Sequence, residues 1–141
     1  VPAGQTKGYM FGYTILNDVS ARDVQTAHKQ WYFGKSLDGF TPIGPCIVTA
    51  DAFADYPPRL GIRSFVNGEK RQDSNTALQI FDIDHVIAEL SQGMTLKAGT
   101  IIATGTPAGV GMGMDPPQFL KPGDVVRCEI EGIGTLTNPV K

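Results

Sequence analysis

The sequence predicts a β-rich α+β domain with short helices, on three observations. Short apolar runs alternate with glycine and proline, which number 17 and 10 in 141 residues, and this indicates many turns. The dipeptide Asn67-Gly68 separates two extended runs, which is typical of a β-hairpin. Helical patterns are few and short. At 41% hydrophobic residues, the chain can form one domain with one core, and nothing marks an internal boundary.

The first predicted elements are a strand followed closely by a helix. Residues 9–16 are apolar and aromatic and predict a buried strand, which stops just before Asp18. Ser20 then offers an N-cap, with Asp23 three residues later, for a helix over residues 21–29. This arrangement predicts a strand end that leads directly into a helix.

The later elements follow from the same rules. Asn67-Gly68 suits a type I′ turn because both central residues of that turn need a positive φ. Asp84 is a candidate N-cap for a second helix over residues 85–92. Apolar or extended runs bounded by turn residues predict further strands over residues 46–49, 62–66, 69–72, 100–103, 125–130 and 135–140.

Composition excludes several classes of partner. The net charge is −2, from 12 basic and 14 acidic residues, so the chain lacks the basic character of a nucleic-acid-binding protein. No apolar run approaches the roughly 18 residues of a membrane span, and we expect no membrane partner. Cys46 and Cys128 belong to no metal or redox motif, and we interpret both as small buried hydrophobic residues. Such sparse cysteine fits a reducing compartment, and we expect a cytoplasmic location.

The densest group of polar side chains follows the first predicted strand. Arg22 and Gln25 lie three residues apart and so share one helix face, with Asp18 near the same side. A carboxylate is a natural ligand of a hard cation such as Mg²⁺, and a guanidinium suits a substrate carboxylate. The alternative is an Asp18–Arg22 ion pair that only ties the helix to the strand, and spacing alone does not choose between these interpretations.

A second candidate is Lys35, which follows Gly34 among aromatic residues. A lysine in apolar surroundings is partly desolvated, which favours its neutral form and a role in proton transfer. The alternative, and the one that the residues by themselves favour, is a surface lysine in a loop over an aromatic cluster.

A third candidate is the glycine-rich stretch that contains Gly105 and Thr106, after a predicted strand. Its glycine spacing fits neither a dinucleotide-binding loop nor a phosphate-binding P-loop. A turn that presents the Thr106 hydroxyl and backbone N–H groups to a substrate is one interpretation, and an ordinary turn is the other.

Together and in this order, these regions resemble the fumarylacetoacetate hydrolase family over nearly the whole chain. The resemblance implies a mixed β-roll or sandwich with short helices, a homodimer, and Mg²⁺ or Mn²⁺ that binds a small 2-oxo or diketo acid. The segments that carry it are Asn17-Asp18-Val19-Ser20-Ala21-Arg22-Asp23-Val24-Gln25, Gly34-Lys35-Ser36-Leu37-Asp38, Val66-Asn67-Gly68-Glu69 and Thr104-Gly105-Thr106-Pro107-Ala108-Gly109-Val110-Gly111.

The resemblance also implies residue roles: Asp18 as a metal ligand, Lys35 as the catalytic lysine, and Arg22, Gln25, Gly105 and Thr106 as substrate-binding residues. The expected activity is metal-dependent hydrolysis of a C–C bond in an acylpyruvate or fumarylpyruvate. Alternatives are a 2-hydroxyhepta-2,4-diene-1,7-dioate isomerase of aromatic catabolism, an oxaloacetate-type decarboxylase, or a non-catalytic binding module that has lost the metal.

One feature departs from the family pattern. Members of the family carry a Glu-x-Glu pair of metal ligands and a lid upstream of the segment that resembles residues 12–25, and this sequence has neither before Asp18. One carboxylate supplies too few oxygens for a hard cation, which needs about six. We therefore expect residues 1–141 to be the carboxy-terminal catalytic domain of a longer enzyme.

Overall fold

The structure is a computed structural model that describes residues 1–27 and 29–141. It is β-rich, with two antiparallel sheets and few short helices, as the sequence predicts. The strands are β1 (Gly12–Leu16), β2 (Ile43–Thr49), β3 (Gly61–Val66), β4 (Glu69–Asn75), β5 (Val125–Ile130) and β6 (Gly134–Pro139), and the α-helices are α1 (Arg22–Ala27) and α2 (Ile83–Gly93).

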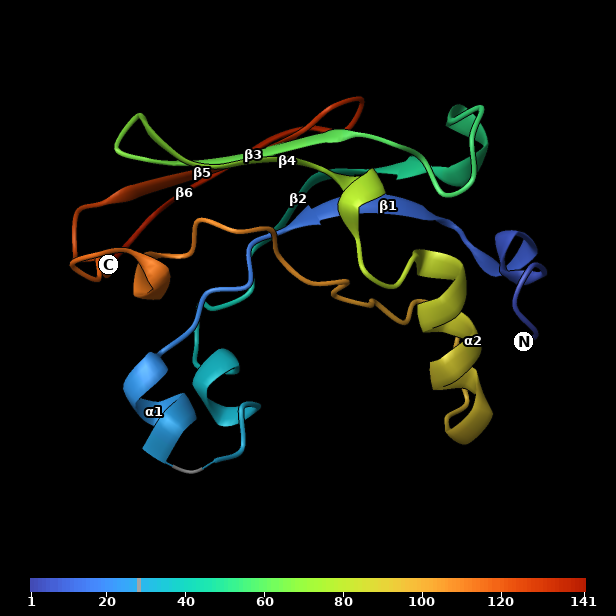
Figure 1. The fold of residues 1–141 in the computed structure, drawn as a ribbon, viewed down its shortest axis with the longest axis horizontal. Helices are drawn as coiled ribbons and strands as arrows, with labels where there is room; N and C mark the ends of the chain where they lie inside the picture. The colour runs from blue at the N-terminus through green and yellow to red at the C-terminus, as the bar shows by residue number, and fades with distance from the viewer. Residues whose placement is uncertain (28) are drawn as a thin grey trace.

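The larger sheet has the strand order β4-β3-β5-β6, and β1 pairs with β2 in a second sheet. Figure 1 shows β1 and β2 against one side of the larger sheet, with α1 and α2 projecting from that same side at separate places. β1 contacts β5 and β6, and β2 contacts β6, so the two sheets form one layered unit. The buried hydrophobic side chains of the described residues are Ile15, Ile87, Val126 and Ile133.

The β3–β4 hairpin forms as predicted. Asn67 has φ 52° and Gly68 has φ 84°, and Val66 pairs with Glu69 across the turn. The Asn67 side chain also reaches the neighbouring strand, where its amide donates to Asp124 and its oxygen accepts from the backbone N–H of Val125. The turn therefore holds β5 in place as well as joining β3 to β4.

Three predicted element starts are wrong, and one of them is that of β2, which begins at Ile43 and not at residue 46. The first strand begins at Gly12, because Thr6–Tyr9 forms a 3₁₀ turn ahead of it. The N-cap of α2 is Asp82, whose carboxylate accepts from the backbone N–H of His85. Asp84 is instead engaged by Thr6 and Gly4, far along the chain, a partnership that local helix signals do not contain.

Three further expectations need correction or stay open. Residues 100–103 form no strand, because no strand of the described chain pairs with them, and Ile101 is exposed. Cys46 is exposed on β2, not buried, because β2 lies in a two-stranded sheet with an uncovered face. The predicted helix over residues 21–29 is helical at Arg22–Ala27 and not at Ala21 or at Lys29, which has φ 52°, and residue 28 lies outside the described residues.

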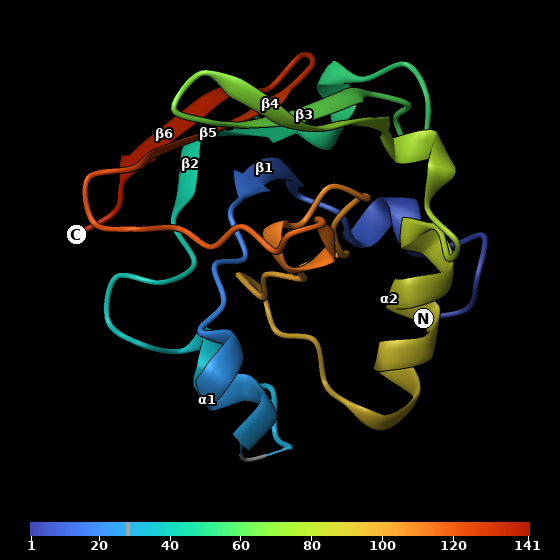
Figure 2. The ribbon, with the colours of Figure 1, turned by 60° about the vertical axis from the view of Figure 1, so that its left-hand side comes forward.

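The segment that follows α2 returns beneath the larger sheet. Figure 2 shows residues of about 95–120, in gold and orange, running from α2 past β1 toward the start of β5. This path brings the glycine-rich turn near the strand ends and α1. None of the helices in the described part of the chain combines the length and the apolar character that crossing a bilayer requires.

Candidate active site

A close backbone approach brings Lys35 to Asp18. Lys35 ends a short 3₁₀ helix that packs against α1, and the carbonyl oxygen of Gly34 accepts from the N–H of Ala21 at 2.8 Å. A Cβ on Gly34 would lie 2.8 Å from the Cβ of Gln25 and 2.9 Å from its backbone nitrogen. Only glycine fits this contact without a shift of backbone, so Gly34 permits the packing that positions Lys35.

Lys35 is the centre of the polar group. Its Nζ donates to Asp18 Oδ2 at 2.6 Å and to Ser20 Oγ at 2.8 Å. The side chains of Lys35 and Asp18 are 27% and 38% exposed, so this ion pair is not sealed from water. Lys35 is thus held as the charged partner of a carboxylate. The apolar enclosure considered from the sequence is absent, because Trp31, Tyr32 and Phe33 are each at least half exposed, and the alternative of a lysine near the surface, which the residues by themselves favour, agrees with this exposure.

Ser20 acts differently from the predicted helix cap. Its hydroxyl donates to the carbonyl oxygen of Asp18 at 3.3 Å and accepts from Lys35. The serine therefore joins the strand end to the lysine. Sequence reasoning assigned it to the helix start and missed this contact, because the contact depends on where a residue fifteen positions later folds back.

Arg22 and Gln25 share a face of α1, as the spacing predicts. Arg22 Nη1 donates to Gln25 Oε1 at 2.8 Å. Gln25 is only 4% exposed, so its amide is fixed by packing, while Arg22 is half-buried. Asp18 pairs with Lys35, and the Asp18–Arg22 ion pair considered from the spacing is replaced by this Arg22–Gln25 contact. Within residues 1–27 and 29–141, Gln25 is the side chain that binds the Arg22 guanidinium, which leaves other N–H donors of Arg22 for a ligand.

The glycine-rich turn carries Thr106 to the same region. Gly105 has φ 103°, a conformation that side chains rarely adopt, and the turn leaves Thr106 exposed. The Thr106 hydroxyl accepts from Gln72 Nε2 at 2.8 Å. Gln72 lies on β4, opposite Ser64 of β3, and was not among the predicted site residues. The sequence feature that could have pointed to Gln72 is the alternation of a strand, which places its amide on the same face as Ser74.

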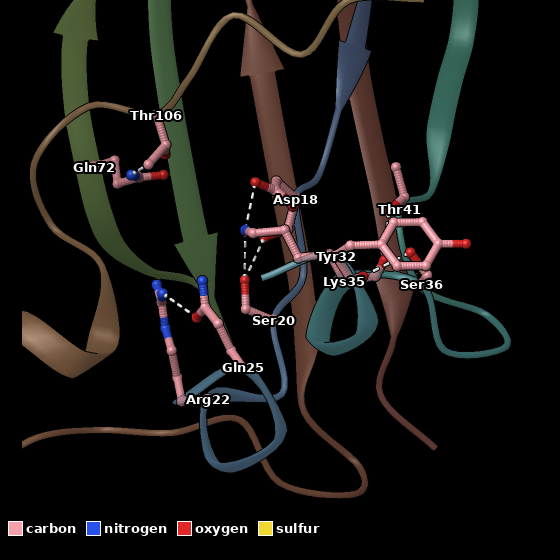
Figure 3. Close-up of polar contacts among 10 residues, drawn as sticks. All are labelled: Asp18, Ser20, Arg22, Gln25, Tyr32, Lys35, Ser36, Thr41, Gln72 and Thr106. Atoms are coloured by element: carbon pink, nitrogen blue, oxygen red, sulfur yellow. Dashed lines mark hydrogen bonds and ion pairs between the residues drawn. The ribbon is translucent and has the colours of Figure 1, made fainter. Parts of the chain in front are cut away.

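Figure 3 shows these side chains around one region. The Gln72–Thr106 pair lies above the Arg22–Gln25 pair, and Asp18, Ser20 and Lys35 lie beside both. The groups come from β4, the 105–106 turn, α1, the end of β1 and the Phe33–Lys35 turn. An ammonium, a guanidinium, a hydroxyl and a carboxylate thus converge on one face. This arrangement suits an anionic ligand that exchanges a proton.

The site is an open face of this chain. The surface hollows around Asp55–Arg59 and between Pro57 and Asp82 share no residue with it. Asp18, Lys35 and Thr106 all remain in partial contact with solvent. Exclusion of water during a reaction would therefore need further polypeptide over this face.

The residues present do not fit a divalent metal by themselves. Among the described residues, no three His, Cys, Asp or Glu side chains gather closely enough to hold a metal ion. Asp18 is a single carboxylate, and one of its oxygens is engaged by Lys35. A hard cation takes about six oxygen ligands, so this donor set falls well short of the expected Mg²⁺ or Mn²⁺ site.

The chain resembles known proteins along its whole length. Residues 1–141 match the sequence profile described as fumarylacetoacetate (FAA) hydrolase C-terminal. A relative named oxaloacetate tautomerase YisK, from Bacillus subtilis, is 51% identical over 132 residues, which are 94% of this chain and 44% of the relative.

Two solved structures share the fold. A fumarylacetoacetate hydrolase from Exiguobacterium antarcticum is 52% identical, with a TM-score of 0.96 over 100% of this chain and 50% of that one. A 2-hydroxyhepta-2,4-diene-1,7-dioate isomerase from Mycobacterium marinum is 47% identical, with a TM-score of 0.87 over 99% of this chain and 51% of that one.

The chain spans about half the length of the curated relatives it matches. The profile match over residues 1–141 and the high identity agree with the motifs around Asp18, Lys35 and Thr106. The chain belongs to the fumarylacetoacetate hydrolase family.

Proposed function

We propose that this chain forms the carboxy-terminal catalytic part of an enzyme that moves a proton on a small 2-oxo acid and interconverts its tautomers or double-bond isomers. The observation that carries the proposal is the Lys35 ammonium, held by Asp18 and Ser20 beside the Arg22–Gln25 pair. A proton-transferring group next to a guanidinium suits an anionic substrate whose reacting carbon adjoins a carbonyl.

In this proposal each residue has one role. Arg22 binds a substrate carboxylate through its remaining N–H donors, and Thr106 binds a carboxylate or oxo oxygen from the opposite side. Gln25, fixed by burial, orients Arg22. The enol oxygen loses its proton to solvent, and the Lys35 charge stabilises the enolate that results. Lys35 then donates the proton that the substrate carbon gains and takes a proton from solvent in return.

The names of the relatives support proton transfer. The Bacillus relative is named an oxaloacetate tautomerase and the Mycobacterium marinum structure a dioate isomerase, and both names describe isomerisation without loss of a fragment. For the substrate we therefore favour a 2-oxo dicarboxylate or its enol. One general acid–base pair suffices for this chemistry.

A second candidate is hydrolysis of a C–C bond in an acylpyruvate or fumarylpyruvate. It is favoured by the name of the Exiguobacterium structure, a fumarylacetoacetate hydrolase. Hydrolysis also requires a base that activates water, and in the cluster of Figure 3 the only carboxylate is Asp18, already paired with Lys35. Decarboxylation of oxaloacetate is a further outcome of the same enolate chemistry.

The proposal extends to the whole protein. We propose that residues 1–141 are part of a longer chain and that the carboxylates needed for Mg²⁺ or Mn²⁺ come from outside them, because Asp18 alone cannot hold such an ion. When bound, the metal would polarise the 2-oxo acid. A homodimer and a cytoplasmic location complete the proposal.

The decisive experiment is a substrate panel on the full-length natural protein that carries this chain. Oxaloacetate, acetylpyruvate, fumarylpyruvate and a 2-hydroxydienedioate would be followed for enol loss, pyruvate release and CO₂. We expect enol–keto exchange without cleavage, and a fall in kcat of roughly 10²- to 10⁴-fold in Lys35→Met. The matched control is Lys97→Met, since Lys97 is exposed and belongs to no part of the site.

The outcomes separate the candidates. Pyruvate release that depends on Lys35 would replace isomerisation by hydrolysis, and CO₂ release would replace it by decarboxylation. If Lys35→Met stays folded and turns over every substrate as fast as Lys97→Met, the catalytic role of Lys35 is wrong. Binding of these acids without any turnover would instead identify a non-catalytic module.

A further inference from the structure

In the described part of the chain, the Gln72 side chain makes three hydrogen bonds, which use both of its N–H donors and its oxygen. Its Nε2 donates to Thr106 Oγ1 at 2.8 Å and to the carbonyl oxygen of Pro107 at 2.8 Å. Its Oε1 accepts from Ser64 Oγ at 2.8 Å. An amide has two N–H donors, and both donors of Gln72 are used at the turn of residues 105–107 while its oxygen is bound from β3.

Chemistry fixes the direction of these bonds. A carbonyl oxygen only accepts, so the Gln72 atom that faces the Pro107 oxygen must be the NH₂ group. That same nitrogen faces Thr106, and an amide nitrogen does not accept. Thr106 must therefore accept from Gln72, and Ser64 must donate to the Gln72 oxygen.

The consequence lies at the Thr106 hydroxyl. Its oxygen is used as an acceptor by Gln72, while its own hydrogen has no protein acceptor recorded in the described part of the chain. Because Thr106 is exposed, that hydrogen is available to a ligand on the open face. The chain of bonds from Ser64 through Gln72 polarises the hydroxyl further as a donor.

The backbone holds the turn in register with Gln72. Gly109 has φ 107°, and a Cβ at this position would collide with the carbonyl oxygen of Arg71. The end of the turn therefore lies directly on β4 beside Gln72, which limits how far Thr106 can move. A short polar side chain on a stiff turn, oriented by a strand residue, is a preorganised donor.

We infer that Gln72 is a positioning residue that orients the Thr106 hydroxyl so that its hydrogen points to the ligand and not into the protein. This part of the site therefore selects a ligand oxygen that accepts a hydrogen bond, such as that of a carboxylate or an enolate. The inference rests on the proposed role of Thr106 in binding substrate. It assigns Gln72 no contact with substrate, and it requires that Gln72 act through Thr106 alone.

The test reverses the direction of the hydrogen bond between Gln72 and Thr106. In Gln72→Glu a carboxylate of nearly the same shape replaces the amide, so Thr106 donates its hydrogen inward and loses it for the substrate. In the full-length natural protein we expect the KM for oxaloacetate to rise roughly 10- to 100-fold, with a smaller change in kcat. As the pH falls toward about 4.3 the new carboxyl gains a proton, and we expect the defect to shrink relative to the unaltered protein.

Two more variants test whether Gln72 affects substrate binding through Thr106. Gln72→Met removes the amide without attracting the Thr106 hydrogen, so its KM should rise less than that of Gln72→Glu. In a Thr106→Val background, Gln72→Glu should change KM less than about threefold, since nothing remains to reorient. Gln92→Glu, on the exposed side of α2, is the matched control for the added charge.

The failures are distinguishable. If Thr106→Val leaves KM unchanged, the proposed substrate contact is wrong. If Thr106→Val raises KM but Gln72→Glu does not, or raises it equally in both backgrounds, the substrate contact stands and the positioning role of Gln72 is wrong. Circular dichroism and Tm of each variant check the fold, and a Gln72→Met protein that folds keeps the comparison decisive should Gln72→Glu not fold.

Discussion

At the scale of single residues, the Lys35–Asp18 ion pair of the site fixes the position of the lysine and adds little to the stability of the fold. An exposed ion pair contributes about 0–1 kcal/mol to stability, and the Lys35–Asp18 pair is about one third exposed. Its value is geometric, because two acceptors fix the direction of one flexible ammonium. In the proposed mechanism, a substrate that enters the site would replace or share these contacts.

Tyr13 has a buried hydroxyl that no other described residue binds through a hydrogen bond. Burial, with a smaller effect of Tyr56, raises its pKa to about 12 from an ordinary value of 10.0. The unfolded chain therefore releases this proton first. The corresponding stability is fully present below pH 10 and is lost as the pH rises from about 10 through about 12.

We predict that Tyr13→Phe removes this alkaline loss and stabilises the protein by about 1 kcal/mol at neutral pH, because it deletes an unpaired polar group and keeps the ring contact with Phe53. Urea unfolding between pH 7 and pH 11.5 measures both effects. Tyr9→Phe, at an exposed tyrosine, is the control. A variant whose stability falls with pH as steeply as that of the parent would contradict the assignment.

At the scale of elements, turns and caps position the strands, and their partners often lie far away in the sequence. Asn67 ties the hairpin turn to the start of β5, and Asp84 ties α2 to the first residues of the chain. The adjacent carboxylate of Asp82 accepts from the third residue of α2 and caps it. Asp82 therefore caps the helix, whereas Asp84, two residues later, makes a tertiary contact.

We predict that Asp82→Ala lowers the free energy of unfolding by about 1 kcal/mol through loss of the cap. Asp84→Ala should leave the helix start intact and loosen residues 1–6, which hydrogen exchange would detect as faster exchange at Gly4. Asp55→Ala, at an exposed position, controls for loss of a negative charge. Equal helix fraying in Asp82→Ala and Asp84→Ala would contradict this division of roles.

At the scale of the whole molecule, little apolar surface is buried within residues 1–141. Four hydrophobic side chains of the described residues are buried, whereas Phe11, Ile47, Ile80 and many others are at least half exposed. Isolated apolar side chains on a surface are ordinary, but an excess of this size supports the proposal that other polypeptide covers part of this surface. The open site and the match to about half of each relative point the same way.

We predict that residues 1–141 expressed alone bind a hydrophobic dye such as ANS strongly and self-associate in light scattering as concentration rises. The full-length natural protein should bind far less dye and form one discrete oligomer, which we expect to be a dimer. Replacing Ile80, which is 93% exposed, with Lys should reduce association of the isolated chain. If the isolated chain is monodisperse and does not bind ANS, the prediction that other polypeptide covers this surface is wrong.

The sequence by itself determined the β-rich class, the hairpin at Asn67-Gly68 and the face shared by Arg22 and Gln25, because turn conformations and helix periodicity are local properties. It also located Lys35 and Thr106 through motifs that resemble the family. The partner of Lys35, the contact between Gln72 and Thr106 and the engagement of Asp84 by Gly4 and Thr6 were decided by tertiary structure, because each depends on a residue brought from elsewhere in the chain. Residues 100–103 make the same point, since an extended run becomes a strand only where a neighbouring edge is available to pair with it.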